Sequence, residues 1–291
     1  MGNYEIGLPR HYSMQYNPST ECSVFGIYNK PNDYLDCNRD DYRMYSSLLQ
    51  DTYESDAILI AKELLSLFLG YSKIFDKDRY LVNDFDVSKI TEWKMPSRAD
   101  YLESYNFELI DTTHNFTVNS FTLDMYNVPI YYLREIYDKN IDAKADYFRL
   151  TNNFFNFLLY LSNKYDDIYI LLKICALEID WVNLYRIYES LDDIVKIQSS
   201  YPYLKEEKGK KDKIIKCLDI KKNRDRLTRP ANNFSILGLS SRHGYKPNAT
   251  AKKQDDDFSL SEAKEFVFSH VKNYLSWRVK CEAKELNNSY H

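Results

Sequence analysis

The residues best suited to chemistry are concentrated in one short segment, residues 224–244, with the sequence RDRLTRPANNFSILGLSSRHG. This segment holds four arginines, two adjacent asparagines, two glycines and one of the five histidines of the chain. Arginine binds phosphate oxygens through a planar fork of donors, and histidine titrates near neutral pH. We therefore expect any active or ligand-binding site of this protein to include part of this segment.

A metal-independent ribonuclease could be assembled from these residues. His243 would take the proton of a ribose 2′-hydroxyl, while Arg242 and Arg229 would stabilise the charge that develops on the phosphate. These three residues are the predicted catalytic set. Further residues are predicted to bind the substrate, and they are Asn232, Asn233, Arg226 and Gly244. We expect neither a metal ion nor another cofactor.

Two other interpretations of the segment remain open. In the first, it is a structural clasp, in which Arg242 and His243 bind carbonyls at a helix C-terminus and Asn232 caps a turn. In the second, it belongs to a non-catalytic helical module or a subunit of a larger complex. That module would recognise a protein or nucleic acid together with the basic stretch 205–226, which has ten Lys/Arg against five Asp/Glu.

Composition restricts how such a protein could meet nucleic acid. The net charge is −4, so contact with phosphate requires a local basic patch rather than a general attraction. The chain is rich in aromatic residues, with 27 Tyr and 15 Phe. Codon usage in an AT-rich genome explains this richness, and stacking platforms for nucleic acid are the alternative explanation.

The five cysteines are scattered and form no Cys-x-x-Cys pair, which argues against a zinc site and against a disulfide framework. The first residues lack the apolar core of a secretory signal, and no apolar run is long enough to span a membrane. We therefore expect a cytoplasmic protein with no membrane partner. RNA is the expected partner, and a homodimer or larger complex is expected to complete the cleft.

Apolar side chains at helical spacing predict the elements that position the segment. A helix is expected over 54–72 with Gly70 as its stop, another over 142–163, and one long helix or two over 166–199. Alternating residues at 117–126 favour strands or an irregular arm within 73–128.

The last helix is predicted most clearly. Ser259 and Glu262 have the spacing of a capping box, and an apolar stripe runs from Ala263 to Trp277, with His270 expected as a core histidine. The predicted fold class is mainly α. It comprises an irregular, partly β region of α+β type over 1–128 and a helical bundle over 129–291 that carries the Arg/His segment.

The C-terminal part is similar to a family of uncharacterised bacterial proteins. The shared pattern is a helix with Trp-x-x-Leu-Tyr-(basic)-Ile-x-Glu, then Ala-Asn, a Gly, Arg-His-Gly, and a helix that begins Leu-x-Glu-Ala and ends in Trp. The matching residues are Trp181, Leu184, Tyr185, Arg186, Ile187, Glu189, Ala231, Asn232, Gly238, Arg242, His243, Gly244, Leu260, Glu262, Ala263 and Trp277. The resemblance covers roughly residues 170–280 and implies a shared fold but no particular activity.

A looser resemblance is to HEPN domains, helical bundles found in many bacterial defence and toxin ribonucleases. In those domains an Arg, often followed by Asn or Asp, precedes a His by a few residues. Here Arg229 precedes His243 by fourteen residues, and Arg242 is adjacent to it. The resemblance implies an RNA-directed effector in phage defence or a toxin system.

Overall fold

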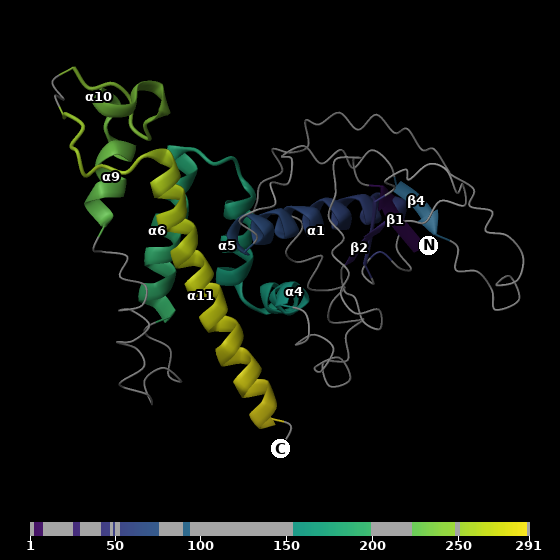
Figure 1. The fold of residues 1–291 in the computed structure, drawn as a ribbon. Coiled ribbons are helices and arrows are strands. Elements are labelled where there is room, and N and C mark those ends of the chain that lie inside the picture. Colours follow the sequence, from purple (N-terminus) through teal and green to yellow (C-terminus); the bar gives the residue numbers. More distant parts are fainter. Residues whose placement is uncertain are drawn as a thin grey trace, which may run out of the picture. The chain divides into compact units, whose positions relative to one another are not determined.

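The computed structural model describes residues 3–7, 26–29, 42–46, 49, 53–75, 90–93, 154–198, 223–247 and 251–289. This part of the chain is mainly helical, as predicted (Figure 1). Its helices are α1 (Glu54–Phe75), α4 (Phe154–Lys164), α5 (Asp166–Ala176), α6 (Trp181–Gln198), α9 (Arg224–Asn232), α10 (Phe234–Leu237), the 3-10 turn η4 (Gly238–Ser240) and α11 (Leu260–Ser289).

Four short strands form one antiparallel sheet in the order β2-β3-β1-β4. They are β1 (Asn3–Gly7), β2 (Gly26–Asn29), β3 (Tyr42–Tyr45) and β4 (Ile90–Trp93). In the centre of the sheet, Ile6 of β1 is paired with Met44 of β3 on one side and with Ile90 of β4 on the other.

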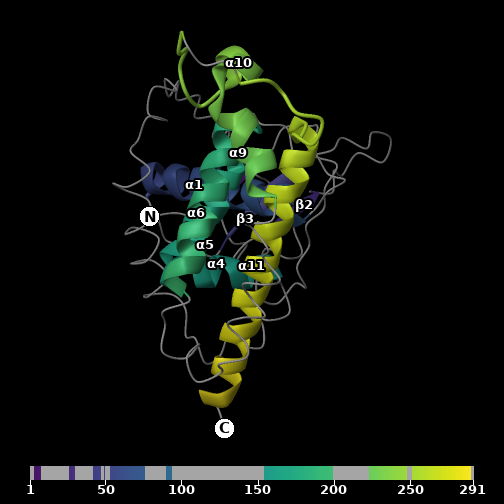
Figure 2. The same cartoon turned by 90° about the vertical axis from the view of Figure 1, so that its left-hand side faces the viewer.

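The described elements fall into two compact units. The first contains the sheet, helix α1 up to Phe68, and α4. The second contains the end of α1 from Leu69 onward, together with α5, α6, α9, α10, η4 and α11. Within the second unit, α6 contacts α5, α9 and α11, and α11 runs beside α6 in both ribbon views (Figures 1 and 2).

Helix α1 corrects the predicted stop at Gly70, because the helix continues to Phe75. A Cβ at position 70 would collide with the backbone carbonyl of Leu172 in α5. Glycine is therefore required here for close approach of two helices and not for a helix end. One turn further along α1, the Lys73 ammonium donates to the carbonyls of Ala176 and Leu177, both at 2.8 Å, and so caps the C-terminus of α5.

The region 166–199 forms two helices in succession, one of the two predicted arrangements. The chain leaves α5 after Ala176 and starts α6 at Trp181. Asp180 marks the new start, since its carboxylate accepts the backbone N–H of Asn183 at 2.7 Å. One face of α6 is buried, including Trp181, Leu184 and Tyr188.

Helix α11 begins with the predicted capping box. The Ser259 backbone N–H and hydroxyl both donate to the Glu262 carboxylate at 2.8 Å, and the Glu262 N–H returns to the Ser259 hydroxyl at 3.3 Å. The predicted apolar stripe is buried at Ala263, Val267 and Val271. His270, predicted to be a core histidine, is only half-buried, and its Nδ1 lies 2.6 Å from the Phe266 carbonyl oxygen.

Several predicted features lie outside the described residues. These are the strands or arm at 117–126, the beginning of the helix over 142–163, the domain boundary at 128/129, most of the irregular region over 1–128, and most of the basic stretch 205–226. Among the helices that the structure does describe, none combines the length and hydrophobicity needed to cross a bilayer.

Candidate functional site: the Arg/His segment between α9 and α11

The segment that carries the predicted site residues is largely ordered into short helices. The first nine residues of the segment form helix α9. Pro230 lies in its last turn, two residues before the helix ends at Asn232. Helix α10 and the turn η4 follow, and Gly238 between them has φ +59°, a conformation that residues with a Cβ rarely adopt. Residues 241–247 and 251–259 are the described residues between η4 and α11.

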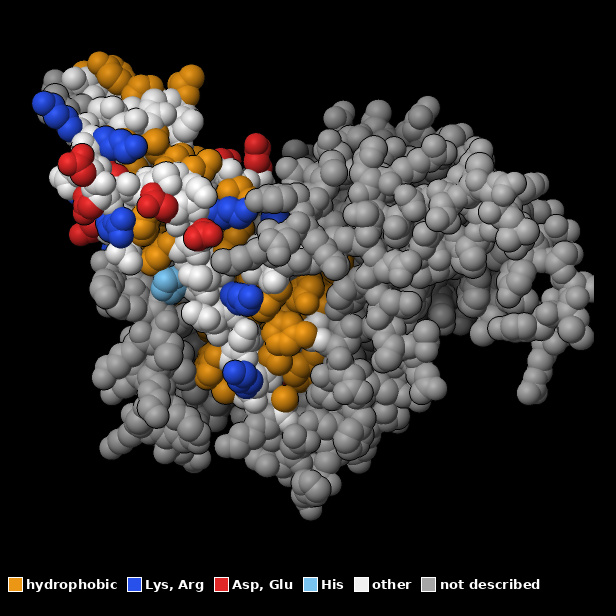
Figure 3. Space-filling view, in the orientation of Figure 1, with side chains coloured by type: hydrophobic (Ala, Val, Ile, Leu, Met, Phe, Trp, Pro, Cys, Tyr) orange, Lys and Arg blue, Asp and Glu red, His pale blue; other side chains and the backbone are white. Residues whose placement is uncertain are grey.

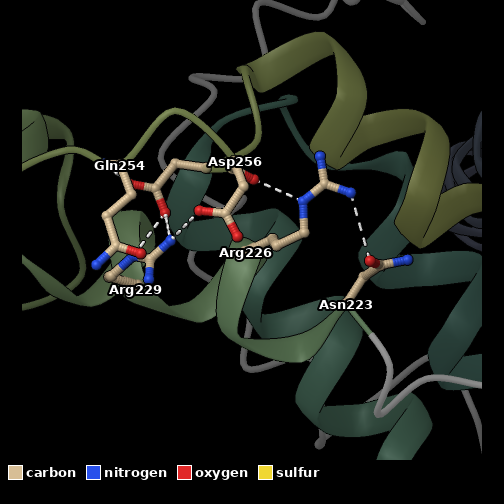
Figure 4. A network of polar contacts seen from close by, with 6 residues as sticks. Asn223, Arg226, Arg229, Gln254 and Asp256 are labelled. Carbon is tan, nitrogen blue, oxygen red and sulfur yellow. Dashed lines mark hydrogen bonds and ion pairs between the residues drawn. The ribbon is translucent and has the colours of Figure 1, made fainter.

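Arg229, predicted to be catalytic, is bound within the protein. Its Nε donates to the Asp257 carboxylate at 2.7 Å, and its terminal nitrogen reaches Asp256 at 2.8 Å and Asp257 at 2.5 Å (Figure 4). The side chain of Asp257 is completely buried, and its second oxygen accepts the backbone N–H of Gln254 at 2.7 Å. The hydrogen bond to Asp257 raises the pKa of Arg229 further. This arginine neutralises a buried carboxylate and fastens α9 to the start of α11.

Arg226, predicted to bind substrate, serves the same attachment. Its Nε donates to the Asp256 backbone carbonyl at 2.5 Å, and its terminal nitrogen reaches the Asn223 side chain at 3.4 Å (Figure 4). Its guanidinium also lies 4.3 Å from the ring centroid of Phe258. Phe258 in turn donates its backbone N–H to the Arg226 carbonyl at 3.2 Å, so a backbone hydrogen bond and a cation–π contact join the two residues.

Arg242 ties the middle of the segment to α6 and α9. Its backbone N–H donates to the Ala231 carbonyl at 2.8 Å, near the end of α9. Its guanidinium lies 4.3 Å from the Tyr185 ring centroid and 3.2 Å from the Glu189 carboxylate. Residues far apart in the sequence are thereby brought together.

The two asparagines differ in their roles. The Asn233 side chain donates to the Arg229 carbonyl at 2.5 Å, so it closes the C-terminus of α9. Asn232 lies half-buried, and its side-chain oxygen is buried without a hydrogen-bond partner. A buried acceptor without a partner is costly in a folded protein, which marks Asn232 as the predicted binding residue that structural contacts explain least.

His243 and Gly244 lie at the edge of a small open hollow of about 80 Å³. Both are exposed, and the His243 backbone carbonyl is held by the Ser241 hydroxyl at 2.6 Å. The hollow is lined by Asn232, Asn233, Phe234, Ser235, His243, Gly244, Tyr245 and Lys246. Four of the seven predicted site residues therefore meet here, while the three arginines are used elsewhere.

Sequence reasoning missed the lining residues Phe234, Tyr245 and Lys246. The signal that could have found them is the charge pattern, because residues 227–254 contain five Lys/Arg and not one Asp or Glu. Lys246, Lys252 and Lys253 within this stretch are exposed. Among the described residues, no group of three His, Cys, Asp or Glu side chains is placed to hold a metal ion.

Comparison with known proteins gives no match: no family model, no curated protein and no solved structure is similar to this chain.

Proposed function

We propose that residues 224–258 form the binding element of an RNA-directed helical module. The observation that carries the proposal is the hollow beside α10, where exposed His243 and Lys246 stand in a stretch free of acidic residues. In a chain with net charge −4, such a patch is where a polyanion would bind. Figure 3 shows Lys and Arg side chains near the end of the unit that carries α10, with Asp and Glu side chains beside them.

The contacts of the three arginines within the protein favour binding over catalysis. Stabilising a phosphorane needs a cation that is free to meet the substrate. Arg229 and Arg226 are fixed against residues 256–258, and Arg242 is shared between Tyr185 and Glu189. Their contacts serve the clasp that holds the hollow in shape.

A metal-independent ribonuclease is the second candidate, and Lys246 is the observation that favours it. Lys246 lines the same hollow as His243, so it could replace the arginines as the cation at the phosphate. His243 would accept the 2′-hydroxyl proton while the 2′-oxygen attacks phosphorus. The bond to the 5′-oxygen would break, and this oxygen would take a proton from water, to give a 2′,3′-cyclic phosphate and a 5′-hydroxyl. A role in phage defence or a toxin system follows only from the resemblance to HEPN domains, and a homodimer remains a prediction.

The test measures the affinity of the protein for a fluorescent single-stranded RNA of about 12 nucleotides. Fluorescence anisotropy reports the binding, in EDTA and at several salt concentrations. Lys246→Gln should weaken binding and reduce the salt slope by about one, as expected for one lost phosphate contact. Lys280→Gln, which removes an exposed lysine of α11, is the matched control and should leave binding unchanged.

A denaturing gel of the same samples shows whether the RNA is cleaved, and this distinguishes the two candidate functions. Intact RNA in the presence of bound wild-type protein supports the binding module. RNA cleavage that His243→Ala abolishes, with binding retained, would establish the ribonuclease instead. Absence of any binding by the wild-type protein would refute both.

A further inference from the structure

Tyr245 is the most prominent aromatic side chain at the hollow. It lies between Gly244 and Lys246 and is 69% exposed. Its ring meets that of Phe234 at a centroid distance of 5.6 Å and an angle of 69°. An edge-to-face contact covers at most one face of a ring, so the other face of Tyr245 is open to solvent.

The backbone around this ring is braced on both sides. The Ser235 hydroxyl donates to the Ala251 carbonyl at 3.0 Å, and the Ser241 hydroxyl lies within hydrogen-bond distance of the carbonyls of Gly238 and His243, at 2.9 and 2.6 Å. Arg242 fixes the same turn to α6 through its contact with Tyr185. The ring is therefore held in place before any ligand arrives, which lowers the entropic cost of binding.

We propose that Tyr245 is a stacking platform for one unpaired nucleobase, and this rests on the proposed RNA-binding function. A flat, open ring at the edge of the hollow offers the face that a base requires, and the adjacent Lys246 and His243 place positive charge or donors near the phosphate of that nucleotide. A duplex hides the faces of its bases within the stack. The site therefore takes single-stranded RNA and discriminates against duplex.

A competing explanation is a generic apolar surface. Leu239 in η4 is 95% exposed, and Figure 3 shows hydrophobic side chains gathered where α10 lies in Figure 1. A protein partner that covers this surface would depend on Leu239 as much as on Tyr245. The base-stacking proposal differs because it requires an aromatic ring at position 245 and places no demand on Leu239.

The experiment compares Tyr245→Phe, Tyr245→Leu, Leu239→Ala and the control Tyr53→Leu, which removes another exposed tyrosine. Each is titrated with the single-stranded RNA and with its duplex. We expect Tyr245→Leu to weaken single-strand binding by about tenfold or more, as loss of one stacked base does, and Tyr245→Phe to retain it. Leu239→Ala and Tyr53→Leu should bind like the wild type, and all proteins should bind duplex more weakly.

Three results would overturn the proposal while the proposed function stands: normal binding by Tyr245→Leu when Lys246→Gln is impaired, an equal loss in Leu239→Ala, or equal affinity for duplex and single strand. Failure of the wild-type protein to bind any RNA would remove the proposed function and this inference together. Ultraviolet crosslinking followed by mass spectrometry provides a second measurement, and the crosslinked peptide should contain Tyr245.

Discussion

The guanidinium of Arg242 lies 4.3 Å from the centre of the Tyr185 ring, across 57 residues of sequence. The same group reaches the Glu189 carboxylate one turn further along α6. Two contacts of one cation thus hold the turn that precedes His243 against the bundle. This arrangement makes Arg242 a residue that positions the hollow.

Arg242→Ala should therefore lower stability modestly. An exposed ion pair and an exposed cation–π contact each contribute on the order of 0.5–1 kcal/mol, so the free energy of unfolding should fall by about 1 kcal/mol. Urea denaturation measures this change, with Arg186→Ala, which removes an exposed arginine of α6, as the control. A loss no larger than that of Arg186→Ala would mean that the Tyr185 and Glu189 contacts do not stabilise the fold.

Arg229→Ala should be more damaging than Arg242→Ala. It leaves the completely buried side chain of Asp257 without its cation, and an unpaired buried charge is strongly destabilising. We expect the melting temperature to drop by several degrees, and Arg229→Ala combined with Asp257→Asn to recover part of the loss. If Arg229→Ala melted like the wild type, the attachment of α9 to residues 256–257 would have no energetic role.

Gly70, Gly238 and Gly244 should respond differently to alanine. Gly70→Ala should destabilise despite the better helix propensity of alanine, worth about 1 kcal/mol, because its Cβ meets the backbone of Leu172 and backbone cannot move aside. Gly238→Ala should also destabilise through its positive φ. Gly244→Ala should be neutral for folding, since nothing lies within 4 Å of its Cβ.

Gly244→Ala then becomes a clean test of the site. It keeps the fold, so a loss of RNA affinity would show that the ligand approaches the backbone at this residue. Thermal melts of all three variants, together with RNA titration of Gly244→Ala, separate folding from binding. Equal melting of Gly70→Ala and Gly244→Ala would contradict the close approach of α1 and α5.

Ser259→Ala should remove about 1 kcal/mol of stability at neutral pH by breaking the capping box of α11. The backbone and hydroxyl donors of Ser259 lower the pKa of Glu262 below its ordinary value of 4.5. A lowered carboxyl pKa stabilises the fold above the unfolded-state pKa, and this stabilisation is lost as pH falls through the folded-state pKa. The gap between wild type and Ser259→Ala should thus narrow below about pH 4.5, and a constant gap in denaturant titrations would argue against this role of Glu262.

The sequence by itself determined the features that depend on neighbours along the chain. The mainly helical class, the capping box at Ser259 and the buried stripe of α11 follow from local spacing, because helices bury residues three and four apart. The sequence also located the segment where chemistry-bearing residues gather. It did not identify Tyr245 or Lys246, whose place in the hollow depends on the turn that follows η4.

Only the tertiary structure decided what the arginines do. Arg229 meets Asp257 across 28 residues, and Arg242 meets Glu189 across 53, and no local pattern encodes such pairs. The same holds for Gly70, whose type suggested a helix end until the backbone of Leu172 was seen beside it. The type of a side chain determines what it can bind, but the packing of distant elements determines which partner it meets. Because of that packing, three predicted site residues make structural contacts beside the hollow.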